Sequence, residues 1–216
     1  MGKHCKMAFE TRYKNYLKSI IQKREWKILK SCVIIKSKMK VINTEFAGLK
    51  IIEPDKFDDN RGYYLKSFEK KAFRNLGIDF EIVQVSHSFN QTKGTIRGVH
   101  FQVGPFAQGK LVFCVKGNVF DVAIDLRKDS ATYGKWFGLE LSQKNMQILF
   151  IPKGFAHGFQ TLEENSEVIY FISEVYSKEH ESGVRWDDSA FAIKWPLEPT
   201  VISDKDSQWP AFESNA

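Results

Sequence analysis

The stretch GTIRGVHFQVGPFAQGK (residues 94–110) sets three basic side chains, Arg97, His100 and Lys110, among glycines and apolar residues. A second stretch, IPKGFAHGF (residues 151–159), adds His157. The chain between them consists of short apolar runs separated by Gly, Asn and Asp, which is the pattern of strands joined by turns. Basic side chains on short strands indicate a small-molecule site inside a β-barrel.

Several other segments also have the character of short strands. Strict alternation in VFDVAID (119–125) predicts a strand with two different faces. One face carries Val119, Asp121, Ala123 and Asp125, and the other carries Phe120, Val122 and Ile124. Similar runs occur at near-regular spacing, namely KLVFCVKG, WFGLEL, MQILFIP and EVIYFISEVY. In a chain of 216 residues, this predicts one large, mainly β domain, a jelly roll or antiparallel β-sandwich with a few short helices.

Three segments have distinct local patterns. The segment EKKAFRNL (69–76) is predicted as a short helix that Gly77 closes. The segment FDDNRGYYLKSF (57–68) is predicted as a turn followed by an aromatic strand. The polar segment KEHESGVRWDDSA (178–190) is predicted as a loop.

The distribution of charge divides the chain at residue 39. The net charge is +6, but residues 1–38 hold 11 Lys and Arg against 2 Asp and Glu, whereas residues 39–216 hold 21 against 24. The body therefore gives little support for nucleic-acid binding. We interpret residues 1–38 as a basic leading segment, either a solvated, disordered appendage or an upstream extension with Met39 as the original start. The alternative is an amphipathic helix at a membrane surface.

The cysteines and the apolar runs indicate the compartment. Cys5, Cys32 and Cys114 form no paired framework and no CxxC motif. This usage is typical of a reducing compartment and argues against a structural zinc site. No apolar run reaches the roughly 18–20 residues needed to span a bilayer, and no signal peptide is evident at the charged start. We therefore expect a cytoplasmic protein that needs no membrane.

The spacing of Arg97 and His100 bears on the chemistry of the site. In a regular strand these two residues point to opposite faces, so we expect Gly98 to bend the strand and bring both to one side. Metal-binding barrels of the cupin type place two His one residue apart, followed by a Glu. Here Gln102 stands two residues after His100, and no Glu follows nearby. Two histidines without a carboxylate or thiolate make a poor set of ligands, so we predict no metal.

Without a metal, these side chain types can move protons. A histidine oriented by a carboxylate can take a proton next to a carbonyl group. A buried lysine can stabilise the enolate oxygen that forms, and a tyrosine can return a proton to the opposite face. Such a set inverts a stereocentre, and arginines suit a substrate with a phosphate or diphosphate. Spacing does not select which of the seven tyrosines takes part.

A series of motifs in residues 39–212 resembles one family. In order, they are DNRGYY, GTIRGVHFQ, AQGKLV, VFDVAIDLRKDSATYGKW, LSQKN, IPKGFAHGFQTL, VRWDD, IKWP and ISDKD. Together they resemble the dTDP-4-dehydrorhamnose 3,5-epimerases, cupin-fold enzymes of dTDP-L-rhamnose synthesis. The resemblance implies a cofactor-free homodimer that inverts carbon 3, carbon 5 or both of a nucleotide-linked 4-keto-6-deoxy sugar. The implied reaction converts dTDP-4-dehydro-6-deoxyglucose to dTDP-4-dehydrorhamnose.

The resemblance also implies roles for individual residues. By motif match, His100 is the base, Asp206 its carboxylate partner, Lys110 the group that stabilises the enolate, and Tyr170 the acid on the opposite face. Arg61 is implied to reach in from the partner subunit, and a strand near residues 40–53 is implied to pair with that subunit. The positions implied to line the site or to bind substrate are Arg61, Lys66, Gln84, Ser86, Arg97, His157, Glu181 and Lys205.

Departures from the family pattern leave alternatives open. The family usually has a glutamate where Lys66 stands, and often an arginine where Phe113 stands. It usually has Gln-x-Asn-x-Ser-x-Ser where residues 84–90 read QVSHSFN. Lys66 and Ser86 match the region that binds the nucleotide base, so a mono-epimerase of a CDP-linked 4-keto deoxy sugar is one alternative. The others are a keto-sugar isomerase, a non-catalytic sugar-nucleotide-binding barrel, and a metal-dependent oxygenase of the cupin class.

Overall fold

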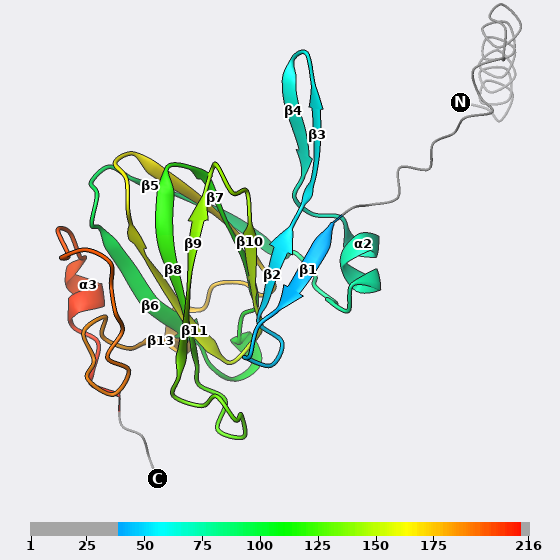
Figure 1. The fold of residues 1–216 in the computed structure, drawn as a ribbon. Helices are drawn as coiled ribbons and strands as arrows, with labels where there is room; N and C mark the ends of the chain where they lie inside the picture. Colours follow the sequence, from blue (N-terminus) through cyan, green and yellow to red (C-terminus); the bar gives the residue numbers. More distant parts are fainter. Residues whose placement is uncertain (1–38, 213–216) are drawn as a thin grey trace, which may run out of the picture. The chain divides into compact units, whose positions relative to one another are not determined.

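The computed structural model describes residues 39–212, which form two β-sheets facing each other (Figure 1). Neighbouring strands within each sheet pair antiparallel. The first sheet has six strands, in the order β1 (Lys40–Asn43), β2 (Lys50–Glu53), β10 (Ile148–Ile151), β7 (Lys110–Lys116), β12 (Ser166–Ile172) and β5 (Gln84–Asn90). The second has five, in the order β13 (Glu181–Gly183), β6 (Ile96–Gln102), β11 (Phe155–Thr161), β8 (Asn118–Asp125) and β9 (Trp136–Ser142). The predictions for residues 1–38 lie outside the described residues.

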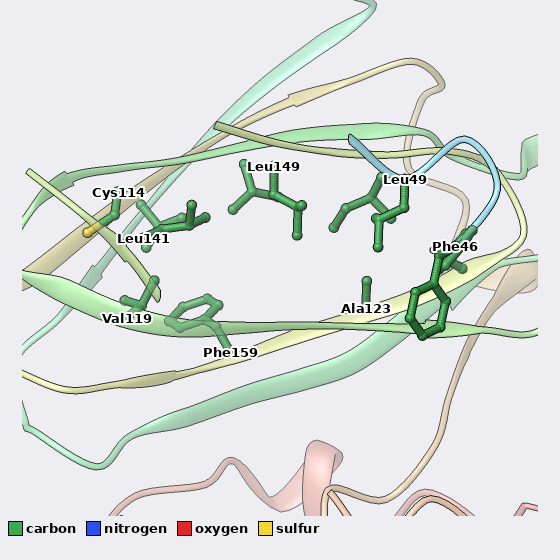
Figure 2. Close-up of a cluster of buried hydrophobic side chains, with 12 residues drawn as sticks. Phe46, Leu49, Cys114, Val119, Ala123, Leu141, Leu149 and Phe159 are labelled. Carbon is green, nitrogen blue, oxygen red and sulfur yellow. The ribbon is translucent and has the colours of Figure 1, made fainter. Parts of the chain in front are cut away.

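Side chains from both sheets meet in an apolar layer between them (Figure 2). On β8, Val119 and Ala123 enter this layer, whereas Val122 and Ile124 enter a separate cluster on the outer face of the second sheet. The two faces predicted for residues 119–125 are therefore confirmed. Because such a core is close-packed, side chains that point inward from these strands have well-defined positions.

A short helix covers the outer face of the first sheet. Helix α2 (Lys70–Asn75) buries Ala72 and Phe73. Phe73 packs in a cluster with residues of the first sheet, including Leu111 of β7. The helix ends just before Gly77, whose φ of +74° suits a residue without a side chain. The predicted helix is therefore confirmed.

A separate hairpin extends away from the two sheets (Figure 1). It consists of β3 (Asp55–Asp59) and β4 (Gly62–Lys66), paired antiparallel. This confirms the predicted turn and aromatic strand. Tyr63 and Tyr64 are 56% and 63% exposed, so β4 presents aromatic side chains to the surroundings of this chain.

Residues 184–212 run along the outer face of the second sheet. Phe191 and Val184 pack there against the outward side chains of β8. The side chain of Gln160 on β11 holds this segment by donating to the carbonyl oxygen of Leu197 at 2.8 Å and accepting from its N–H at 3.0 Å. As a result, residues near the end of this segment lie next to β6.

Four short elements were not predicted. The segment predicted as a loop contains β13, which pairs with β6, and the 3-10 helix η2 (Lys178–His180) precedes it. The tail contains the helix α3 (Asp204–Ser207), where the side chain of Ser203 accepts the N–H of Asp206. A further 3-10 helix, η1 (Gly104–Phe106), follows β6. Within residues 39–212, no helix has the length and apolar character that a membrane crossing requires.

Candidate active site

A cavity of about 450 Å³ opens between the two sheets. Strands β5, β7 and β12 of the first sheet form one wall, strands β6 and β11 of the second form the other, and residues of α3 close one side. Most of the predicted site residues line it: Gln84, Ser86, Arg97, His100, Lys110, His157, Tyr170, Glu181, Lys205 and Asp206.

Strand β6 departs from regular geometry at Gly98. Arg97 and His100 pair with residues of β11 that are only two positions apart, so β6 has one extra residue there. Gly98 has a φ of +111°, and a Cβ atom on it would lie 2.6 Å from the Cα of Gly158. Only glycine fits this bulge. The bulge brings Arg97 and His100 to the same face, as predicted.

His100 is paired with a buried carboxylate. Its Nε2 lies 2.6 Å from Oδ1 of Asp206, a residue only 4% exposed, and the N–H of Gly98 donates to Oδ2 at 3.0 Å. Burial works to raise the pKa of Asp206, but the hydrogen bonds from His100 and Gly98 outweigh it and hold that pKa below its usual value. The charged carboxylate fixes the imidazole, and the second ring nitrogen is left for proton transfer.

A second His–carboxylate pair lies on the same wall. Nε2 of His157 is 2.9 Å from Oδ2 of Asp121, and both residues are buried. Burial lowers the pKa of His157 despite the charge of Asp121. Burial also lowers the pKa of Lys110 to about 8, against the opposing influence of Asp121 and Glu181. Lys110 is therefore mostly protonated at pH 7. Within residues 39–212, no three His, Cys, Asp or Glu side chains are grouped so that they could hold a metal ion.

Tyr170, on β12, faces His100 and His157 from the opposite wall of the cavity. Its ring centroid lies 6.1 Å from that of His157, and its hydroxyl is 3.0 Å from Oγ of Ser88. Burial raises the pKa of Tyr170 well above its usual value. The phenol therefore keeps its proton until a strong base forms beside it.

Polar and charged side chains surround the part of the cavity that meets solvent. Glu181 accepts hydrogen bonds from the hydroxyl of Tyr176 at 2.7 Å and from Nζ of Lys205 at 2.5 Å. Nε2 of Gln84 donates to Oγ of Ser86 at 2.9 Å. This rim offers a cation and several donors, which suit phosphate oxygens.

Two predicted residues lie elsewhere. The side chain of Arg61, near the tip of the hairpin, is 85% exposed and pairs with Asp59 at 2.5 Å. Nζ of Lys66 lies 2.7 Å from Glu69. Neither residue is part of the cavity lining that residues 39–212 of one chain provide, so their substrate contacts stay predictions.

Among the residues at the site that the sequence analysis did not select, three make polar contacts with the predicted ones: Asp121, Ser88 and Tyr176. Asp121 had an available signal, because an acidic residue on the core face of an apolar strand needs a buried partner. Ser88 also had one, since it lies two residues from Ser86 on the same strand face. Tyr176 lies outside any regular strand, and its sequence context carried no comparable signal.

Residues 43–214 match the family model described as dTDP-4-dehydrorhamnose 3,5-epimerase. The chain belongs to this family. The dTDP-4-dehydrorhamnose 3,5-epimerase of Shigella flexneri is 48% identical over 175 residues, which cover 81% of this chain and 96% of the relative.

Solved structures of the family agree with this chain in fold. The Bacillus anthracis dTDP-4-dehydrorhamnose 3,5-epimerase, with TDP and PPi bound, is 46% identical with a TM-score of 0.79, over 81% of this chain and 99% of that one. The Legionella pneumophila dTDP-6-deoxy-D-glucose-3,5-epimerase, in complex with dTDP-4-keto-L-rhamnose, is 42% identical with a TM-score of 0.76, over 80% and 92%. The predicted family and the predicted cupin-type β fold are confirmed, and the chain is an epimerase of the isomerase class.

Proposed function

We propose that this chain converts dTDP-4-dehydro-6-deoxyglucose to dTDP-4-dehydrorhamnose by proton transfer at carbons 3 and 5, through an enolate and without a cofactor. The observation that carries the proposal is a His–carboxylate pair and a tyrosine on opposite walls of one cavity, with a lysine lining the same space. The ligands TDP and dTDP-4-keto-L-rhamnose in the Bacillus and Legionella structures support the substrate class.

His100 takes the proton in the first step. The C–H bond next to the keto group breaks, the proton goes to the free imidazole nitrogen, and the electron pair moves to the carbonyl oxygen to give the enolate. Asp206, 2.6 Å from the other ring nitrogen, stabilises the imidazolium that forms.

Lys110 stabilises the charge on the enolate oxygen. Its pKa of about 8 leaves it protonated at neutral pH. A buried positive charge interacts with a developing oxyanion more strongly than the same charge in water.

Tyr170 returns a proton to the opposite face. It lies on the first sheet, whereas His100 lies on the second, so the carbon between them is reprotonated from the other side and its configuration inverts. A keto-sugar isomerase would instead form the new C–H bond at the former carbonyl carbon, while the hydroxyl on the carbon that lost its proton is deprotonated and becomes the new carbonyl. An acid on the wall opposite the base, facing the same carbon, serves inversion better.

The remaining polar residues hold the nucleotide sugar. Arg97 and Lys205 supply positive charge, and Glu181 fixes Lys205. Lys66 and Ser86 match the part of the family pattern that contacts the base, so a mono-epimerase of a CDP-linked sugar is the alternative that the experiment must separate.

We also expect the protein to act in the cytoplasm, in line with its cysteine usage.

We further propose a homodimer in which Arg61 contributes to the partner's cavity. Large apolar side chains are exposed on the outward side of β5 and on the hairpin: Val85 is 58%, Phe89 52% and Tyr64 63% exposed. Large exposed apolar side chains are typical of an interface. Sedimentation equilibrium measures the oligomeric state directly, and a monomer at micromolar protein concentration would contradict the proposed dimer.

The reaction is tested by incubating the protein in deuterated water with the dTDP-linked and then the CDP-linked 4-keto-6-deoxyglucose, and following the sugar by NMR. We expect deuterium at carbons 3 and 5 with the dTDP substrate. Deuterium at one carbon with the CDP substrate alone would establish the alternative. Binding of either substrate without exchange would mean a non-catalytic barrel.

Two variants identify the groups. His100→Ala should remain folded and lose exchange at both carbons, because the base is missing. His180→Ala is the matched control, since His180 stacks on Phe106 with ring centroids 4.4 Å apart and has no proposed part in proton transfer. Exchange retained by His100→Ala would refute its role as base.

A further inference from the structure

The hydroxyl of Tyr170 has a neighbour that the sequence analysis did not assign to the reaction. Oγ of Ser88 lies 3.0 Å from it, and either atom can be the donor. Ser88 is on β5 and Tyr170 on β12, one diagonal position away from each other across the strand pair. Which of the two hydroxyls donates decides whether the proton of Tyr170 is available to the substrate.

The surroundings of Asn90 decide the direction of this hydrogen bond. Oδ1 of Asn90 lies 2.5 Å from Nε of Arg97, which can only donate, so this side of the amide is the acceptor. Nδ2 lies 3.1 Å from the carbonyl oxygen of Ser166, which can only accept. Asn90 is 2% exposed, and these two contacts fix the orientation of its amide.

The amide nitrogen of Asn90 therefore faces Ser88 as a donor. The separation between Nδ2 and Oγ of Ser88 is 3.5 Å, a long contact. Because Oγ receives this N–H, the hydroxyl proton of Ser88 is directed to its other neighbour, the oxygen of Tyr170. The phenolic proton of Tyr170 then points into the cavity.

From this arrangement we infer that Ser88 and Asn90 are positioning residues, which orient the Tyr170 hydroxyl as a proton donor to the substrate carbon. The inference rests on the proposed epimerisation. In the step that they assist, the O–H bond of Tyr170 breaks, a C–H bond forms on the enolate, and the negative charge moves from the enolate to the tyrosinate oxygen. The hydroxyl of Ser88 then donates to that anion.

The two residues also favour the charge that the step creates. Burial raises the pKa of Tyr170, while the hydrogen bond from Ser88 and the charge of Arg97 act in the opposite direction. Arg97 reaches Asn90 directly, so one hydrogen-bonded chain runs from the guanidinium through Asn90 and Ser88 to the phenol. Hydrogen bonds in such chains reinforce each other.

The test measures two rates at the same carbon of the dTDP-linked keto sugar in deuterated water: deuterium incorporation, which needs His100, and inversion, which also needs Tyr170. A reduced supply of protons from Tyr170 lets the enolate be reprotonated from the His100 side, which gives exchange without inversion. Ser88→Ala should lower the ratio of inversion to exchange by about tenfold to a hundredfold. This ratio does not depend on the fraction of folded protein.

Three further variants sharpen the test. Ser88→Thr keeps the hydroxyl and should restore a ratio close to wild type. Asn90→Asp has no N–H to donate, so the Ser88 proton turns toward residue 90 and the ratio should fall at least as far as in Ser88→Ala. Ser189→Ala, at an exposed position, is the matched control and should keep the wild-type ratio.

The outcomes separate this inference from the proposed function. Equal losses of exchange and inversion in Ser88→Ala, or an unchanged ratio, would overturn the positioning role while wild-type epimerisation stands. Failure of Ser88→Thr to restore the ratio would also overturn it. Absence of both exchange and inversion in the wild-type protein would contradict the proposed function itself.

Discussion

Replacing Lys110 with methionine should make the protein more stable and much less active. Lys110 holds a buried charge in the cavity wall, and burial lowers its pKa from 10.5 to about 8. Methionine has a similar length and no charge, so it fills the space without the desolvation penalty. Loss of the cation should reduce kcat by about 10²–10³-fold, as when one donor to an oxyanion is removed.

The gain in stability follows from linkage between protonation and folding. Because the folded-state pKa lies below the unfolded value, the unfolded chain binds more protons between pH 8 and 10.5. The wild-type protein therefore becomes more stable as the pH rises through this interval, and its penalty is complete below pH 8. The shift corresponds to about 3 kcal/mol at pH 7 and about 1.5 kcal/mol at pH 9.5. Lys110→Met should recover these amounts.

Urea denaturation of the wild-type protein and of Lys110→Met at pH 7 and pH 9.5 measures the gain in free energy of unfolding at each pH. An NMR assay measures turnover. The matched control is Lys116→Met on the same strand, where the side chain is 53% exposed and pairs with Glu167. This variant should change stability by less than about 1 kcal/mol, because surface ion pairs contribute little. A Lys110→Met protein that is less stable than wild type at pH 7, or equally stabilised at both pH values, would refute the reasoning.

Three other changes test the surroundings of the base and the lysine. Asp121→Asn removes a negative charge that raises the pKa of Lys110. The alkaline limb of the pH–kcat profile should therefore move below its wild-type position near pH 8. An unmoved limb would contradict the influence of Asp121 on Lys110. Gly98→Ala should lower the free energy of unfolding by about 2–5 kcal/mol in urea titrations, because its Cβ would collide with the neighbouring strand; a loss under about 1 kcal/mol counts against the bulge. Asp206→Asn should reduce kcat about 10- to 150-fold in steady-state assays with KM little changed, because the charge beside His100 is lost; an unchanged kcat refutes its role.

Local patterns in the sequence were sufficient for most of the fold. Alternation in residues 119–125 predicted both faces of β8 because side chains of a strand alternate by geometry alone. The helix at residues 69–76 was predictable from its apolar spacing and from Gly77. Among the elements that were not predicted, β13 and α3 contain 3 and 4 residues. Elements this short are stabilised by their tertiary contacts and carry no periodic signal.

The site was predictable only as far as its motifs reach. The family match selected His100 and Asp206, which lie 106 positions apart in the chain, a pairing that no spacing rule provides. The contact between Ser88 and Tyr170, which are separated by 82 positions, was not predicted because it depends on the register between β5 and β12. Register is set by the packing of whole strands, so it is visible only once the sheets are assembled.

Transfer of protons to opposite faces of one carbon suits a fold of two facing sheets. In the proposed mechanism, a planar enolate held between them presents each face to a different sheet, and His100 and Tyr170 belong to different sheets. Since side chains alternate along a strand, the register of a residue decides whether its side chain points into the cavity. For His100, the one-residue bulge at Gly98 decides this direction. A change that removes the bulge would turn Arg97 or His100 away from the cavity and leave Tyr170 in place. We therefore expect the folded fraction of Gly98→Ala to lose deuterium exchange, beyond the loss that its lower stability causes. The reason is that the base, His100, is displaced while the acid, Tyr170, stays in place.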